Sequence, residues 1–149
     1  MNKMLWSLAA LPLALGCAAE DTGDGADGSV ASELAQAELE VQHHHQVVMN
    51  ASDVARVVAE TTRHDEHMRG ILGDLYDSVS NDMHCSHDGE GPMHSMTTNM
   101  EHAQGEHMSG LHGGRSLEAL QAACTAYVAQ MHTLLEDMHR ELVGASCMH

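Results

Sequence analysis

Residues 54–79 read VARVVAETTRHDEHMRGILGDLYDSV, and the spacing of their apolar side chains indicates the fold class. These side chains recur every three or four positions, which is the period of an α-helix and not that of a strand. The preceding cluster Asn50-Ala51-Ser52-Asp53 supplies capping side chains for a helix start. The sequence therefore predicts a long helix, whose inward stripe comprises Val54, Val57, Val58, Thr61, His64, Met68, Ile71, Leu72, Leu75 and Val79.

Two flanking segments show the same helical period. The segment from about Ser32 to Met49 carries the stripe Leu34, Ala37, Val41, His44 or His45, and Val48. The segment that begins at Ser116 carries the stripe Leu117, Leu120, Cys124, Tyr127, Met131, Leu134, Leu135, Met138 and Leu142.

A third helix is predicted more weakly, over residues 93–112. Residues 80–92 form a Met/His-rich loop before it, Gly105 and Gly110 interrupt it, and its stripe is Met93, Met96, Met100 and His107. Its order could depend on bound metal. Four helical segments with short links predict an all-α fold, an antiparallel up-down four-helix bundle.

The amino terminus predicts export. Residues 1–3 are positively charged, and the apolar stretch of residues 4–15 is too short to span a bilayer, as in a secretory signal. The segment Leu13-Ala14-Leu15-Gly16-Cys17 resembles the lipobox of bacterial lipoproteins, which implies lipidation of Cys17 and a membrane contact through this anchor. By resemblance to enterobacterial sorting rules, Ala18 implies the outer membrane. The alternative is a soluble secreted product in which Cys17 is a passive thiol.

Three regions follow from these patterns. Residues 1–17 are the predicted lipoprotein signal peptide, and residues 18–31 are acidic and glycine-rich, which predicts a flexible tether. Residues 32–149 remain as one helical metal-binding domain with a modest core.

The balance of acidic and basic residues limits the classes of molecule that the surface can bind. The chain has 22 acidic residues against 6 Lys plus Arg, a formal net charge of −16, which becomes −17 when Lys3 leaves with the signal. This charge excludes nucleic acid and anionic lipid as partners of the surface and favours cations. Because the chain also has 14 His, acid should both discharge the surface and expel bound metal.

Three cysteines remain after lipidation, namely Cys85, Cys124 and Cys147. An oxidising envelope favours one disulfide and one odd thiol. In the predicted bundle, Cys85 and Cys147 lie at the same end, so we expect them to pair or to share a metal ion. Cys124 is then a small buried apolar residue.

The composition of the chain is unusually rich in methionine and histidine, with 12 Met and 14 His but no Phe. Thioether and imidazole groups bind copper, silver, zinc and nickel. On a helix, residues four apart face each other, as do His45 with Met49, His64 with Met68, Met96 with Met100, and Met108 with His112.

The bundle topology assigns the candidate ligands to three layers. The upper layer holds Met83, His84, Cys85, His87, Cys147, Met148 and His149. The middle layer holds His64, His67, Met68, Met100, His102, Met131 and His132. The lower layer holds His43, His44, His45, Met49, His107, Met108 and His112. Further candidate ligands are Met93, His94, Met96 and His139, and acidic neighbours include Glu60, Asp65, Glu66 and Glu136.

Packing is the competing explanation for several of these residues. Met68, Met131 and Met138 at helical spacing fit core filling, because Met adapts to irregular gaps. The run His43-His44-His45 fits an exposed polar stretch equally well, and His132 and His139 fit solvated positions beside the core stripe. The stretch from Met83 to His112 has no such packing explanation, since it is crowded with His and Met.

The His-x-x-x-Met pairs within residues 43–112 are similar to those of periplasmic silver- and copper-binding proteins of metal-resistance systems. His44-His45-Gln46 also resembles a motif of small helical envelope proteins found with copper-handling systems, although Met49 follows it more closely here. The first functional hypothesis is a non-enzymatic envelope protein that binds or buffers copper or silver, because the many thioethers of this chain favour Cu(I) or Ag(I) over zinc or nickel. Zinc and nickel are further possible ions, and no protein partner is indicated.

Two other functions remain open. His132-x-x-x-Glu136 facing Glu60-x-x-x-His64 resembles part of a hemerythrin-like di-metal site, although His102, His107 and His112 lie five residues apart instead of four. A structural helical lipoprotein without a specific metal is the other alternative. The chain has no Ser-His-Asp arrangement, phosphate-binding loop or His-Glu-x-x-His motif, so no enzyme activity is predicted.

Overall fold

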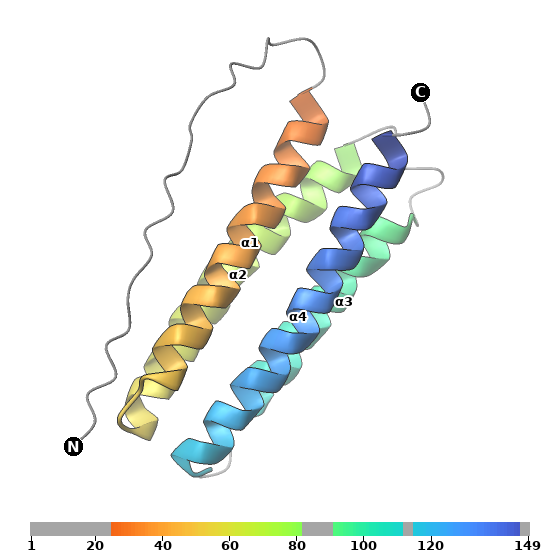
Figure 1. The fold of residues 1–149 in the computed structure, drawn as a ribbon. Helices are drawn as coiled ribbons and strands as arrows, with labels where there is room; N and C mark the ends of the chain where they lie inside the picture. Colours follow the sequence, from red (N-terminus) through yellow and green to blue (C-terminus); the bar gives the residue numbers. More distant parts are fainter. Residues whose placement is uncertain (1–24, 82–90, 112–114, 147–149) are drawn as a thin grey trace, which may run out of the picture.

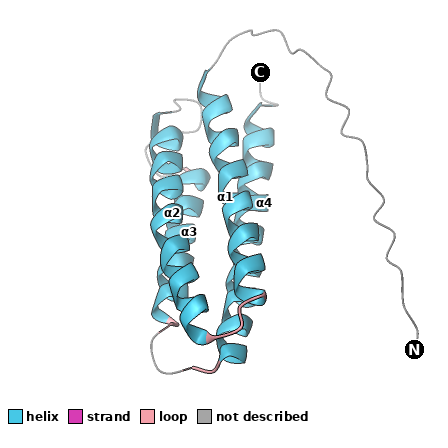
Figure 2. Cartoon of the chain, turned by 90° about the vertical axis from the view of Figure 1, so that its left-hand side faces the viewer, coloured by secondary structure: helices cyan, strands magenta, loops and turns pink. Residues whose placement is uncertain are grey.

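The computed structural model describes residues 25–81, 91–111 and 115–146. These residues form four α-helices, α1 (Gly25–Met49), α2 (Val54–Asn81), α3 (Pro92–Ser109) and α4 (Leu117–Ser146). No strand occurs in this part of the chain (Figure 2), so the all-α prediction is confirmed. Several predicted sites lie outside the described residues: Cys17, residues 18–24 of the tether, Met83, His84, Cys85, His87, His112, Cys147, Met148 and His149.

The four helices lie side by side (Figure 1). α1 and α3 each pack along both α2 and α4, whereas, among these four helices, the backbones of α2 and α4 come close at few points and those of α1 and α3 at none. The end of α1, the start of α2, the end of α3 and the start of α4 lie at the same end of the molecule (Figure 1). Residues from these four segments can therefore meet at one level of the interior. Within the described residues, no helix is both long and apolar enough to cross a membrane.

The first helix begins earlier than predicted. α1 starts at Gly25, whereas the sequence pattern predicted a start near Ser32 and assigned residues 25–31 to the tether. Val30 is fully buried and precedes Leu34 by one turn, so it extends the inward stripe of this helix. Packing of the inward face of α1 stabilises helix at the start of this segment, where the intrinsic helix propensity of the residues is low.

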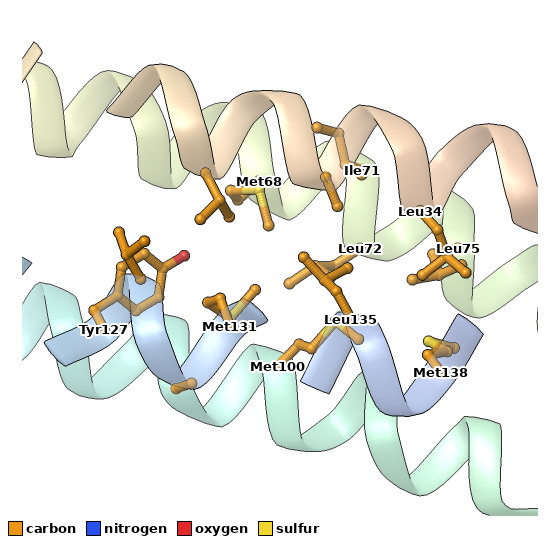
Figure 3. Close-up of a cluster of buried hydrophobic side chains, with 14 of the residues drawn as sticks. Leu34, Met68, Ile71, Leu72, Leu75, Met100, Tyr127, Met131, Leu135 and Met138 are labelled. Carbon is orange, nitrogen blue, oxygen red and sulfur yellow. The ribbon is translucent and has the colours of Figure 1, made fainter. Parts of the chain in front are cut away.

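The apolar stripes form one core (Figure 3). Its largest side chains are wholly buried leucines and methionines, including Leu34, Leu72, Leu75, Met68, Met100, Met131, Leu135 and Met138. The predicted stripes are confirmed except at Val54 and Val58, which are 39% and 38% exposed. Val58 lies about 100° around the helix from the buried Val57, which carries it off the inward face.

The third helix is shorter than predicted and is not interrupted at Gly105. Pro92 begins it, and Gly110 ends it with its N–H donating to the carbonyl of Glu106 at 3.1 Å. Its buried residues are Met93, Thr97, Met100, Ala103, Gln104 and His107. The inward face of α3 is therefore partly polar, and these polar groups need partners in the interior.

Candidate metal centre

The lower half of the interior contains a polar cluster to which every helix contributes. Its members are Glu40 and His44 from α1, Glu60, Arg63, His64 and Asp65 from α2, Gln104 and His107 from α3, and Cys124 and Tyr127 from α4. Except for Arg63, these residues are all buried. Burial of so many polar groups is unfavourable unless they bond one another, and most of them do.

Three potential metal ligands converge in this cluster. One donor atom each from His44, His107 and Cys124 lies within 4.8 Å of the other two, and all three residues are buried. The Nε2 atoms of the two rings are 3.1 Å apart. Two imidazole nitrogens bound to one zinc ion at about 2.0–2.1 Å would lie about 3.3 Å apart. The two rings are thus already near the spacing of ligands that share an ion.

The ring of His44 is oriented from two sides. It stacks on His64 with a centroid distance of 4.0 Å, and its Nδ1 lies 3.4 Å from Oε1 of Glu60. Glu60 as a carboxylate only accepts, so Nδ1 of His44 carries the hydrogen and Nε2 keeps its lone pair. In the metal-free protein, the Nε2–H of His107 then donates to that lone pair. A carboxylate behind a histidine in this way is typical of metal-binding rings.

Tyr127 holds the other two rings in place. It stacks on His107 at 4.2 Å with an interplanar angle of 7°, and its hydroxyl oxygen lies 2.9 Å from Nε2 of His64. The hydroxyl donates to the side-chain carbonyl of Gln104, whose amide donates to Asp65 at 3.2 Å. Figure 3 shows Tyr127 reaching inward from α4. The tyrosine therefore joins α2, α3 and α4 around the candidate ligands.

Arg63 compensates the charges of two buried carboxylates of the cluster. Its Nη2 lies 2.7 Å from Oε1 of Glu40 and 2.8 Å from Oε1 of Glu60. Burial opposes ionisation of Glu40, but hydrogen bonds from Arg63, His64 and His67 outweigh it and lower its pKa to about 2. The pKa of Glu60 is lowered in the same way, since bonds from Arg63 and His44 outweigh burial. Both carboxylates are therefore ionised at neutral pH.

The protonation states of the three candidate ligands follow from burial. Burial lowers the pKa of His44 and of His107 to about 4, and the charge of a neighbouring histidine adds to the effect at each. Burial also lowers the pKa of His64, although Glu40 opposes the shift. The pKa of Cys124 is raised by burial to about 12. At pH 7 the rings of His44 and His107 are therefore neutral, and the thiol of Cys124 is protonated.

The structure groups the predicted candidates differently from the predicted layers. It brings His44, His64 and His107 to one level, whereas the layers separated His64 from the other two. His67 joins them indirectly through a 2.8 Å contact with Glu40. Met68, Met93 and Met100 belong to the hydrophobic core, where Met131 and Met138 also lie.

The remaining candidates lie at the surface or are half-buried. His43, Met49 and His102 are exposed, and His45, His94, Met96, Met108, His132 and His139 are half-buried. Some have other partners, since His102 lies 3.7 Å from Glu106 and His139 lies 3.2 Å from Glu38. The buried Nε2 atom of His45 has no hydrogen-bond partner within the described residues.

The di-metal arrangement does not assemble among the described residues. Glu60 contacts Arg63 and His44, and His64 contacts Glu40 and Tyr127. His132 is half-buried, and Glu136 is exposed. The guanidinium of Arg63 lies between Glu40 and Glu60 and donates to both carboxylates.

Sequence reasoning missed several members of the cluster. It treated Cys124 as a small apolar residue and Tyr127 as core, and it did not select Glu40 or Gln104. A usable signal was the repeated Glu-x-x-x-His spacing, at Glu40 with His44 and at Glu60 with His64, because residues four apart share a helix face.

Comparison of the chain with models of protein families, with curated proteins and with solved structures found no match.

Proposed function

We propose that this chain is a non-enzymatic envelope protein that binds one soft or borderline transition metal ion inside its helical bundle. The ligands are His44, His107 and Cys124, and copper(I) is the favoured ion, followed by silver(I). The observation that supports the proposal is the convergence of these three buried donor atoms, from three different helices, within 4.8 Å. The antiparallel up-down helix order and a lipid anchor at Cys17 in the outer membrane are parts of the same proposal.

The donor types favour a soft ion. Thiolate and imidazole ligands suit copper and zinc, whereas magnesium and calcium prefer oxygen ligands. The core around the cluster is rich in methionine, and Met68, Met100 and Met131 are wholly buried. Two imidazoles and one thiolate also suit zinc(II), so zinc is a further candidate ion after copper(I) and silver(I).

Each ligand has a separate role in this proposal. Glu60 orients His44 from behind, Tyr127 orients His107 by stacking, and Cys124 contributes a negative charge once its proton leaves. A bound ion would tie α1, α3 and α4 together. Binding should therefore stabilise the folded chain, because the unfolded chain does not present the same site.

Removal of single ligands tests the site. We expect the mature protein to bind one copper(I) ion tightly in competition with a chromophoric chelator, and Cys124→Ser and His107→Asn to lose that binding. The matched control is His102→Asn, an exposed histidine on the same helix as His107. All variants should carry Cys85→Ser and Cys147→Ser, so that Cys124 is the only thiol of the domain.

Cobalt(II) supplies a readout that does not depend on affinity. A thiolate-to-cobalt absorption band should appear in the parent protein and disappear in Cys124→Ser. If copper(I) affinity were the same in the parent and in both ligand variants, the site proposed here would be wrong, and binding would belong to the surface His and Met residues.

Metal binding should release close to one proton per ion between pH 6 and 9. Burial raises the pKa of the Cys124 thiol to about 12, whereas the pKa of His44 and of His107 is lowered to about 4, so only the thiol has a proton to lose. The apparent affinity for the metal ion should then rise about tenfold for each unit by which the pH is raised in this range. Titration calorimetry in buffers of different ionisation enthalpy measures the proton count.

The same measurement on Cys124→Ser is the control for this proton. A count of zero in the parent protein would mean that the thiol does not bind the ion. A count near two would mean that further protonated ligands take part.

A further inference from the structure

A groove of about 450 Å³ runs between α3 and α4 and reaches the metal-ligand cluster. Three alanines, Ala103, Ala123 and Ala126, form part of its lining, and His107 and Tyr127 border it as well. Because alanine side chains fill little space, the two helices leave an opening here that larger residues would close.

His107 belongs to both the groove and the candidate metal centre. It is 9% exposed and lines the groove, while its Nε2 lies 3.1 Å from Nε2 of His44. An ion that reached His107 from the groove would therefore be in contact with the first of its three ligands.

A carboxylate lines this groove, and an imidazole lies beside that carboxylate. Glu106 lines the groove, and its Oε1 lies 3.7 Å from Nε2 of His102, which is 74% exposed. The net charge of −16 draws cations toward the surface, and this pair offers them two donor atoms, whereas Arg115 places one positive charge in the lining of the groove.

The end of α3 beside the groove contains two glycines. Gly105 lies inside the helix, and a Cβ added there would meet nothing within 4 Å. Gly110 ends the helix. Glycine weakens a helix interior, so the turn that carries His107 should open more readily than the rest of the bundle.

A second groove is less suited to passage of an ion. It lies between α2 and α3, has a volume of about 300 Å³, and is lined by Asp65 and Gln104. These two side chains bond each other at 3.2 Å, and Gln104 also accepts from Tyr127. An ion that entered there would have to break this network before it reached the imidazoles.

We propose that the groove between α3 and α4 is the route by which the metal ion reaches and leaves its site, from the His102 and Glu106 pair to His107. This inference rests on the proposed function. In this proposal the groove between α3 and α4 determines how fast the metal ion exchanges. The three ligands determine how tightly it binds.

Blocking the groove tests the route. Ala126→Leu places a larger side chain in the groove, and Ala129→Leu is the matched control, an exposed alanine of α4 that does not line it. Stopped-flow transfer of copper(I) from a chromophoric chelator should be slowed about tenfold or more in Ala126→Leu, an added barrier of at least about 1.4 kcal/mol. Release should slow by the same factor, so the equilibrium affinity stays that of the parent, and Ala129→Leu should exchange at the parent rate.

A second experiment stiffens α3 without placing a larger side chain in the groove. Gly105→Ala and the control Gly73→Ala in α2 both add a methyl group to open space, so both should raise the melting temperature. Only Gly105→Ala should slow copper(I) transfer.

The outcomes separate the two proposals. Tight binding with parent-like rates in both Ala126→Leu and Gly105→Ala would overturn the route and leave the metal site intact. Absence of tight copper(I) and zinc(II) binding in the parent protein would overturn the proposed function, and the route with it.

Discussion

Lowering the pH from 7 to 4 should remove several kcal/mol of stability from the metal-free protein. His44 and His107 have a pKa of about 4 in the folded chain, because burial disfavours their charged forms. In the unfolded chain each should titrate near the reference value of about 6.5. Between these values the unfolded state binds more protons, so stability falls as the pH falls. Each ring contributes on the order of 3 kcal/mol, within a typical total of about 5–15 kcal/mol.

Urea unfolding at a series of pH values measures this loss. His44 and His107 should together contribute nearly two protons to the slope of the unfolding free energy against pH near pH 5. His107→Asn should reduce that number by about one, whereas His102→Asn removes an exposed histidine and should leave the slope unchanged. A stability that stays constant from pH 7 to 5 would mean that the two rings are not held neutral by burial.

Arg63→Met should destabilise the fold by about 2–3 kcal/mol. The substitution keeps much of the side-chain volume but leaves Glu40 and Glu60, which are 7% and 9% exposed, without their shared cation. Removing one partner of a fully buried ion pair costs about 3–5 kcal/mol. The smaller value applies here because Arg63 is itself 42% exposed, so solvent screens part of the interaction. Chemical unfolding at pH 7 measures the change.

Arg140→Met is the matched control, because Arg140 is 73% exposed and pairs with Asp137 at the surface. It should change stability by less than about 1 kcal/mol. Adding Glu40→Gln to Arg63→Met should recover part of the lost stability, since it removes one of the uncompensated charges. Equal losses for Arg63→Met and Arg140→Met would show that the buried carboxylates do not depend on the guanidinium.

The helices could be predicted from the sequence because helical periodicity is a local property. The inward stripes of α2 and α4 are long and carry many large apolar side chains, so their positions are determined within each segment. The start of α1 could not be predicted in this way. Residues 25–29 have low helix propensity, and the helix begins at Gly25 where packing of Val30 supports it.

The candidate metal centre could be predicted only in part. The sequence left open whether His44 or His45 faces inward, and only packing against α2, α3 and α4 selects His44. It placed His64 one layer away from His107, because layer assignment from helix order ignores how far each helix slides along its neighbours. Each residue rises about 1.5 Å and turns about 100°, so a shift of one residue changes which side chains meet.

The sequence by itself determined the helical class, the inward faces of the helices, the acidic charge and an abundance of soft metal ligands. The tertiary structure alone decided that His44, His107 and Cys124 meet, that Tyr127 and Glu60 orient the two rings, and that Arg63 neutralises the carboxylates beside them. The physical reason is that these contacts join residues from different helices. Their formation depends on the rotation and axial offset of each helix, which are set by packing of the whole core and not by any local pattern.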